Sequence, residues 1–294
     1  MVSPPVNDQN NQGRAYVLGH SAEELNRLID QARLFGELTE DVFVRAGIGP
    51  GMRVLDVGCG AGDVSFLLAR MVGPSGAVVG VDRAEDAVAM ANARAQAMGL
   101  AQVSFSQGDL EDISLDQPVD AAVGRFVLMY SPEPSIALRR VAANVRAGGI
   151  VAFQEMNVAE AKSFPYVDLF EQSMRWIIET LDREKVKNLM GLGLYRTFVE
   201  AGLPPPQMIM GARVEGSSDS LGYQIVAQVV KSLLPVMEKL GIANEKGSPD
   251  RNPRPAFTGR SNLPRRSDRP ATLGWRVDAK PPGKGRLRMR RETS

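Results

Sequence analysis

Cysteine and histidine are the scarcest reactive residues of this sequence, with one of each in 294 residues. A single thiol, Cys59, cannot form an internal disulfide, so a secreted scaffold held together by disulfides is excluded. One thiol and one imidazole also fall short of the four ligands that structural zinc sites take from these residue types. We therefore expect no metal site.

Long apolar runs are absent as well. The longest of them stop well short of the roughly 18 residues that a membrane-spanning helix needs. Residues 1–12 are polar and lack the apolar centre of a secretory signal, so we expect a cytoplasmic protein without a membrane span. A hydrophobic content of 44% is nevertheless enough for a sizeable core and excludes disorder over the whole chain.

The near-neutral net charge of +1 conceals an uneven distribution. Residues 245–294 carry 14 basic and 5 acidic residues, a net of +9, which leaves residues 1–244 with a net of −8. Because prolines and arginines punctuate residues 245–294 without a period, we predict a basic, disordered tail there and a disordered leader over 1–13. The tail has few aromatic residues between its basic ones, so we expect no nucleic-acid partner.

The segment 14–244 predicts an α/β fold. We expect strands over 52–57, 77–81, 102–107, 119–123 and 150–155, separated by helices over 61–72, 85–98 and 132–145 and preceded by a helix over 21–46. This alternation is typical of a doubly wound, mostly parallel sheet. We further predict a helical cap insertion over 157–205, a strand over 207–214, and a helix over 219–240 that is bent at Pro235.

The most informative segment runs from Val54 to Asp63, where a buried strand meets a turn containing Gly58, Gly60 and Gly62. Glycine lets the backbone turn tightly and approach a ligand closely. Asp82 ends the following strand, 20 residues after Gly62, where a carboxylate can accept hydrogen bonds from both ribose hydroxyls of an adenosine. Asp82 can also serve as the N-cap of the next helix, since Glu85 follows three residues later.

The residue at position 63 distinguishes between adenosine-containing cofactors. A dinucleotide fingerprint needs a third glycine there, but the sequence has Asp63. A carboxylate at the start of the helix repels a diphosphate and competes for the N–H groups that bind it. A positively charged sulfonium avoids this repulsion, so we expect S-adenosylmethionine rather than a nicotinamide or flavin dinucleotide.

With these motifs, the sequence resembles the class I S-adenosylmethionine-dependent methyltransferases and is similar to their ubiquinone and menaquinone biosynthesis branch. The matching segments are Val54 to Asp63, Val79 to Asp82, Gly108-Asp109, and Asp120 to Glu155. The resemblance implies a Rossmann-like methyltransferase fold. That fold is normally closed by a further strand after the helix at 219–240, so either residues 272–277 supply it after a long loop or the sheet edge is incomplete.

The resemblance also implies roles for individual residues. The three glycines pass close to the methionine part of the cofactor, Asp56 supports their loop, and Asp82 holds the ribose. Residues 16–20 form a lid over the cofactor. The implied cofactor-binding residues are Tyr16, Asp56, Gly58, Gly60, Gly62, Asp82, Asp109, Leu110 and Arg125.

Two residues are candidates for acid–base catalysis, His20 and Glu155. His20 is the only side chain that titrates near neutral pH when unperturbed, although it also fits a lid residue. Glu155 ends the fifth strand and faces either the cleft or the next helix. The aromatic stretch within the insertion suits a small, uncharged and partly hydrophobic acceptor. A nicotinamide-dependent oxidoreductase and a non-catalytic cofactor-binding protein stay as alternatives, and oligomeric state is not readable.

Overall fold

The computed structural model describes residue 18, residues 22–217 and residues 219–243. The chain forms two compact units, residues 1–250 and 251–294, and every described residue belongs to the first. The predicted leader, the basic tail and the candidate strand over 272–277 therefore lie outside the described residues. Within the described residues, no helix is long and apolar enough to span a bilayer.

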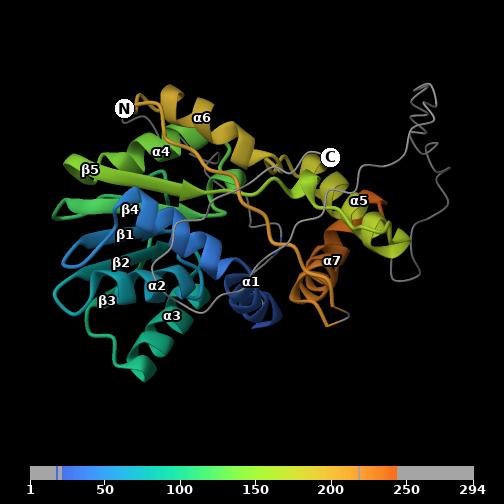
Figure 1. Ribbon diagram of the computed structural model, residues 1–294, viewed down its shortest axis with the longest axis horizontal. Helices are drawn as coiled ribbons and strands as arrows, with labels where there is room; N and C mark the ends of the chain where they lie inside the picture. Colours follow the sequence, from blue (N-terminus) through green and yellow to red (C-terminus); the bar gives the residue numbers. More distant parts are fainter. Residues whose placement is uncertain (1–17, 19–21, 218, 244–294) are drawn as a thin grey trace, which may run out of the picture. The chain divides into compact units, whose positions relative to one another are not determined.

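The centre of the fold is a five-stranded, all-parallel sheet (Figure 1). The strand order is β3-β2-β1-β4-β5, so the order reverses between β1 and β4. In open α/β sheets a crevice forms at such a point, outside the carboxyl ends of the strands. The strands are β1 (Arg53–Val57), β2 (Ala77–Asp82), β3 (Val103–Gln107), β4 (Val119–Arg125) and β5 (Val145–Gln154).

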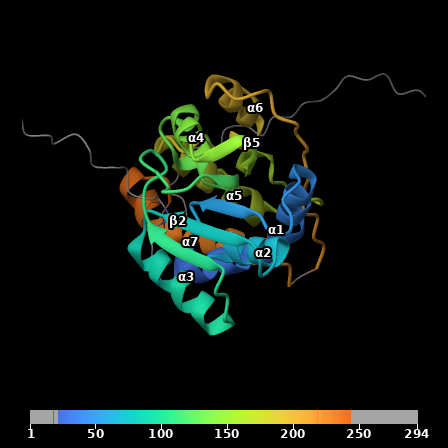
Figure 2. The ribbon, with the colours of Figure 1, turned by 90° about the vertical axis from the view of Figure 1, so that its left-hand side faces the viewer.

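Helices cover both faces of the sheet, which confirms the doubly wound architecture (Figures 1 and 2). Neighbouring β1 residues point to opposite faces: Val54 packs with α1 and α2, and Leu55 packs in the cluster that includes α4 and α6. The third helix, α3, lies against β2 and β3. The bounds are α1 (Ala22–Ala46), α2 (Asp63–Val72), α3 (Glu85–Met98), α4 (Pro134–Ala142) and α6 (Met190–Glu200).

Two further helices, α5 (Asp168–Arg183) and α7 (Leu221–Leu240), pack against each other. The amino-terminal part of α1 joins them, since Glu24 accepts a hydrogen bond from Ser232 of α7 at 3.0 Å. Figure 1 places α5 and α7 at the end of the sheet toward which the strand arrows point. Leu233 and Met237 of α7 are completely buried in this packing. Helix α7 continues through Pro235, where the sequence predicted a bend.

The predicted strand over 207–214 is wrong. These residues are exposed and form no strand, and β5 is the last strand of the described sheet. A strand is stabilised only by pairing with a neighbour, and here the segment instead contacts α1, where Arg213 donates to Glu37 at 2.9 Å. Because the described residues contain no sixth strand, the predicted place of the helical insertion, between strands five and six, is not confirmed. Of its helices, α5 joins α7, whereas α6 packs beside α4.

Candidate functional site

The carboxyl ends of the strands open into one cavity of about 2280 Å³. It is bounded on one side by the loops that follow β1, β2, β3 and β4, and on the other by α1, α5 and α7. Of the predicted residues, Asp56 and Gly62 do not line the cavity. The lining includes seven of the residues that the sequence singled out, namely Gly58, Gly60, Asp82, Asp109, Leu110, Arg125 and Glu155.

The glycine loop after β1 has the geometry that only glycine adopts without strain. Gly58, Gly60 and Gly62 have φ values of 65°, 52° and 89°. A Cβ on Gly58 would lie 2.4 Å from Cγ2 of Val127, in the loop after β4. The loop is tied to β2, because the backbone N–H of Gly58 donates to the carbonyl of Val81 at 2.8 Å. The backbone therefore comes to the cavity wall at the switch point of the sheet.

Asp82 connects this loop to the next helix. Its Oδ2 accepts from the N–H of Gly60 at 2.8 Å, and its Oδ1 accepts from the N–H of Ala84 at 2.9 Å. The N-cap residue of α3 is Ala84, so the N-cap role predicted for Asp82 is wrong. A carboxylate has room for about four hydrogen bonds, so Asp82 keeps capacity for donors from a ligand.

Asp56 is buried beneath the loop, where its Oδ2 accepts from the Ser65 hydroxyl. Burial raises the pKa of Asp56 to about 7, and the hydrogen bond from Ser65 and the nearby charge of Arg125 oppose this rise. Arg125, at the end of β4, lines the cavity, and its guanidinium lies 5.8 Å from the ring centre of Phe126 without an ion pair or side-chain hydrogen bond to a described residue. Burial lowers the pKa of Arg125, while the carboxylates of Asp56 and Asp63 raise it. An unpaired cation in a cleft is suited to a carboxylate ligand.

Asp109 and Leu110 follow β3. Asp109 is exposed, and its Oδ1 accepts from the N–H of Glu111 at 3.1 Å, which fixes the turn. Leu110 packs against the main hydrophobic cluster. Both side chains therefore stand on the rim of the cavity near Asp82, as expected from the order of the strands.

Glu155 supports the turn after β4. Its Oε1 accepts from the N–H groups of Val127 and Leu128 at 3.0 and 2.7 Å. The turn is strained, because Phe126 has a φ of 56°, in the left-handed region that bulky residues avoid. Burial raises the pKa of Glu155 to about 8, and backbone N–H groups, that of Leu128 first, lower it. Its Oε2 is buried without a partner among the described residues.

The predicted residues Tyr16 and His20 lie outside the described residues. Of the predicted lid, only Leu18 is described, and it is buried and lines the cavity. Cys59 is buried in the glycine loop, and burial raises the pKa of its thiol, which leaves it unreactive. The described residues contain no cluster of three or more acidic, histidine or cysteine side chains arranged for a metal ion.

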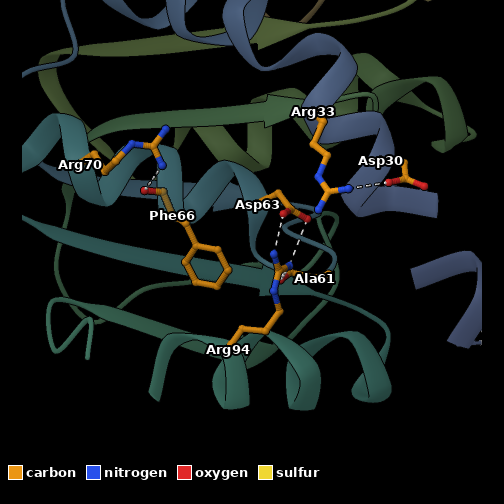
Figure 3. A network of polar contacts seen from close by, with 7 residues as sticks. All are labelled: Asp30, Arg33, Ala61, Asp63, Phe66, Arg70 and Arg94. Atoms are coloured by element: carbon orange, nitrogen blue, oxygen red, sulfur yellow. Dashed lines mark hydrogen bonds and ion pairs between the residues drawn. The ribbon is translucent and has the colours of Figure 1, made fainter. Parts of the chain in front are cut away.

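Sequence reasoning missed the partner of Asp63. Arg94, on α3, donates to both carboxylate oxygens of Asp63, at 2.8 and 3.2 Å (Figure 3). The ion pair with Arg94 weakens the repulsion that was expected between Asp63 and a diphosphate. The two residues are 31 positions apart, and no local motif joins them. They come together because α2 and α3 both lie against β2 and β3.

The far side of the cavity is mainly apolar. Aromatic and aliphatic side chains from α1, the β4 turn, α5 and α7 form it, and Phe35 packs edge-on against Phe126 with ring centroids 5.3 Å apart. A buried polar cluster of Glu24, Arg27 and Gln31 interrupts this wall, with Arg27 paired with Glu24 at 2.6 Å and donating to Gln31. The apolar lining here includes Leu34, Phe35, Phe126, Met174, Ile177, Val226 and Val229.

Comparisons with known proteins agree with this geometry. The family described as "Methyltransferase domain" matches residues 48–201, just over half of the chain. The 2-phytyl-1,4-naphtoquinone methyltransferase of Synechococcus elongatus is 34% identical over 136 residues, covering 44% of this chain and 56% of the relative. The arsenite methyltransferase of Aquipseudomonas alcaligenes is 36% identical over 114 residues, covering 36% of this chain and 33% of the relative. The chain thus matches between a third and somewhat more than half of the length of these relatives.

Among solved structures, the YcgJ protein from Bacillus subtilis has a TM-score of 0.50 and 21% identity, covering 72% of this chain and 92% of the other. At that identity the likeness concerns the fold alone. The residues present fit S-adenosylmethionine: a glycine loop that admits no Cβ at Gly58, a carboxylate at the end of β2, and an arginine at the end of β4 that lines the cavity. The chain therefore belongs to the S-adenosylmethionine-dependent methyltransferase family.

Proposed function

We propose that this protein transfers a methyl group from S-adenosylmethionine to a small, partly hydrophobic acceptor. The observation that supports this most directly is the shared cavity, in which the glycine loop and Asp82 lie opposite an apolar wall from α1, α5 and α7. Pockets for one small ligand usually measure roughly 300–1000 Å³. A cavity of about 2280 Å³ therefore has room for a cofactor and an acceptor together.

In this proposal, each cofactor-binding residue has a distinct task. Asp82 accepts hydrogen bonds from the ribose, while its existing bond to Gly60 holds the glycine loop in place. Arg125 pairs with the carboxylate of the amino acid end, and Asp56 supports the loop from beneath. Asp109 and Leu110 contact the adenine. Tyr16 completes the cofactor site from the lid.

Bound in this cleft, S-adenosylmethionine supplies a methyl group on a positively charged sulfur. The neutral thioether that leaves needs no proton from the protein. The chain's own contribution is then to orient the acceptor in line with the methyl group and to exclude water. The apolar wall beside Phe35 and Phe126 is suited to both tasks.

The relatives' names suggest two classes of acceptor, arsenite and quinones, and the cysteine content of this chain favours the second. Arsenite is a soft ion that binds to several thiolates, and this chain has one cysteine, which is buried. The relatives named as naphthoquinone and demethylmenaquinone methyltransferases point instead to an aromatic acceptor with an apolar body. We propose an acceptor of that kind, such as a quinol or a phenol.

We assign different roles to His20 and Glu155, the two candidates for acid–base catalysis. His20 remains a candidate base within the lid. Glu155 holds the turn that carries Phe126, and its second oxygen, Oε2, is the only part of its carboxylate left for an acceptor. A quinol needs little help from a base, because its carbon or oxygen nucleophile is already activated.

The proposal is tested in two steps with the full-length protein. Isothermal titration calorimetry should detect binding of S-adenosylhomocysteine, and labelled S-adenosylmethionine should transfer its methyl group to a component of host extract that partitions into organic solvent. A folded protein that binds neither cofactor form contradicts the proposal. Label found only in an ionic, water-soluble product contradicts the acceptor class.

A second candidate is a cofactor-binding protein without turnover. The observation that favours it is the sheet edge, because no strand follows β5 among the described residues. It predicts the same calorimetric binding but no labelled product in any extract fraction. Tight binding of NADH in a fluorescence titration would instead support the oxidoreductase alternative.

A further inference from the structure

We propose that Arg94 is a positioning residue for the cofactor site, which holds the glycine loop closed from behind by clamping Ala61 and Asp63. The inference rests on the proposed cofactor site and adds a residue that lies outside it. Arg94 is on α3 and does not line the cavity, whereas Ala61 and Asp63 do. A change at Arg94 therefore removes no direct contact with a ligand, and its effect is expected through the loop that it holds.

Three contacts make the clamp. The guanidinium forms a two-pronged ion pair with Asp63, at 2.8 and 3.2 Å. It also donates to the backbone carbonyl of Ala61. Its flat face lies 5.0 Å from the ring centre of Phe66, one turn along α2. Arginine alone offers this planar fork of donors, and lysine cannot reproduce it.

The position of the contacts explains their effect on the loop. Asp63 is the first residue of α2, and Ala61 lies between Gly60 and Gly62, so the clamp grips the carboxyl-terminal half of the loop. Asp82 grips the amino-terminal half through the N–H of Gly60. The loop is thus fixed at both ends from two different elements.

The clamp also controls charge. The side chains of Arg94 and Asp63 are only 22% and 14% exposed, so an unpaired Asp63 carboxylate would stand in a poorly hydrated place beside the cofactor. Arg33 of α1 appears in the same view, but its ion pair is with Asp30, at 3.2 Å, and not with Asp63 (Figure 3). Among the described residues, Arg94 is therefore the cation that forms an ion pair with Asp63, while Arg125 acts on the same carboxylate from a greater distance.

The test compares Arg94→Met with Arg70→Met in the full-length protein. Arg70 lies on α2, and its replacement removes the same charge. Its only side-chain hydrogen bond with a described residue is a long one, to the carbonyl of Phe66, at 3.5 Å (Figure 3). Without ligand, hydrogen exchange should become faster over residues 58–66 in Arg94→Met and stay at the wild-type rate in Arg70→Met. Calorimetry should find S-adenosylhomocysteine bound about tenfold more weakly by Arg94→Met.

A second pair of variants separates the clamp from general scaffolding. Adding Asp63→Asn to Arg94→Met should recover part of the lost affinity, because the unpaired carboxylate is gone. A purely structural role predicts no recovery. If Arg94→Met does not fold by circular dichroism, Arg94→Lys takes its place, with intermediate affinity and intermediate exchange.

Wild-type exchange and wild-type affinity in Arg94→Met would overturn the proposal, as would a double variant that binds no better than Arg94→Met alone. The exchange measurement needs no ligand. If the wild-type protein failed to bind S-adenosylhomocysteine, the proposed function would fail while the clamp could still be judged by exchange.

Discussion

At the scale of single residues, Asp82 has the largest expected effect on the cofactor. Asp82→Ala removes the proposed acceptor for the ribose and frees the N–H of Gly60 that it holds at 2.8 Å. Charge-assisted hydrogen bonds of this kind contribute about 2 kcal/mol, so the dissociation constant for S-adenosylhomocysteine should rise about 30-fold. Isothermal titration calorimetry measures this change.

The control for Asp82→Ala is Asp86→Ala, which removes an exposed carboxylate from the first turn of α3. It should bind S-adenosylhomocysteine as the wild-type protein does. Equal affinities in the two variants, with circular dichroism spectra unchanged, would rule out Asp82 as a ribose ligand.

Glu155 makes stability depend on pH. Burial raises the pKa of Glu155 to about 8 in the folded protein, well above its ordinary value of 4.5. Between these values the unfolded chain has lost this proton and the folded chain keeps it, so the free energy of unfolding falls as pH rises. Asp56, whose pKa is raised to about 7, acts in the same direction up to that pH. Glu155→Gln removes this titrating group. The free energy of unfolding should then fall less steeply between pH 5 and 8 than in the wild-type protein, with a slope smaller by about 1 kcal/mol per pH unit.

Urea unfolding at several pH values measures this slope. Glu160→Gln, which neutralises an exposed glutamate on the same segment, should leave the slope as in the wild-type protein. A slope in Glu155→Gln equal to that of Glu160→Gln would mean that Glu155 does not carry the pH dependence.

The sequence predicted local features of the site better than long-range ones. The glycines and Asp82 could be read from one strand, one turn and the next strand, because their spacing follows the chain. Arg94 could not, because its contact with Asp63 depends on where α2 and α3 lie on the sheet. The support of the Phe126 turn by Glu155 was missed for the same reason, since it depends on the pairing of β4 with β5.

At the scale of elements, the turn between β1 and α2 is the most sensitive to added atoms. Gly62→Ala introduces a Cβ at a φ of 89°, where it would lie 2.8 Å from Phe66 and 2.9 Å from Phe105. Left-handed strain and overpacking together should lower the free energy of unfolding by about 2–4 kcal/mol. Chemical denaturation measures the loss.

Gly148→Ala is a matched control, because Gly148 has a similar φ of 72° but no atom within 4 Å of the added Cβ. It should lose only the strain, about 1 kcal/mol. If both variants lost the same amount, contact with the two rings would not be the reason for glycine at position 62.

Elements were predicted well where a partner was available. All five strands of the sheet were expected, with ends shifted by up to five residues. The central strands β1 and β4 are buried on both faces, as their continuous apolar runs indicated, whereas β3 at the edge of the sheet is partly exposed. The apolar residues over 207–214 resembled a strand, but this segment pairs with no strand of the described sheet. The hydrophobic pattern of a segment allows a strand, whereas hydrogen bonding to a neighbouring strand is what forms one.

At the scale of the whole molecule, the cofactor should stabilise the fold by binding only the folded state. S-adenosylhomocysteine at 100 times its dissociation constant adds about 2.7 kcal/mol to the free energy of unfolding. For a chain of this size the midpoint of thermal unfolding should then rise by about 5 °C or more. A thermal shift assay measures this, and NADH at the same concentration should leave the midpoint unchanged. A shift with NADH and none with S-adenosylhomocysteine would reverse the assignment.

The two sides of the cavity come from different parts of the chain. The family match covers residues 48–201, which carry every strand of the described sheet and α5, whereas α1 and α7 lie outside it and still line the same cavity. Both helices also pack on the sheet, since Phe43 of α1 lies in one buried cluster with Val54, and Leu233 of α7 lies in another with Leu55. A lineage can thus exchange one acceptor for another only by substitutions on the cavity faces of α1 and α7, because their opposite faces are tied to the same core as the donor half.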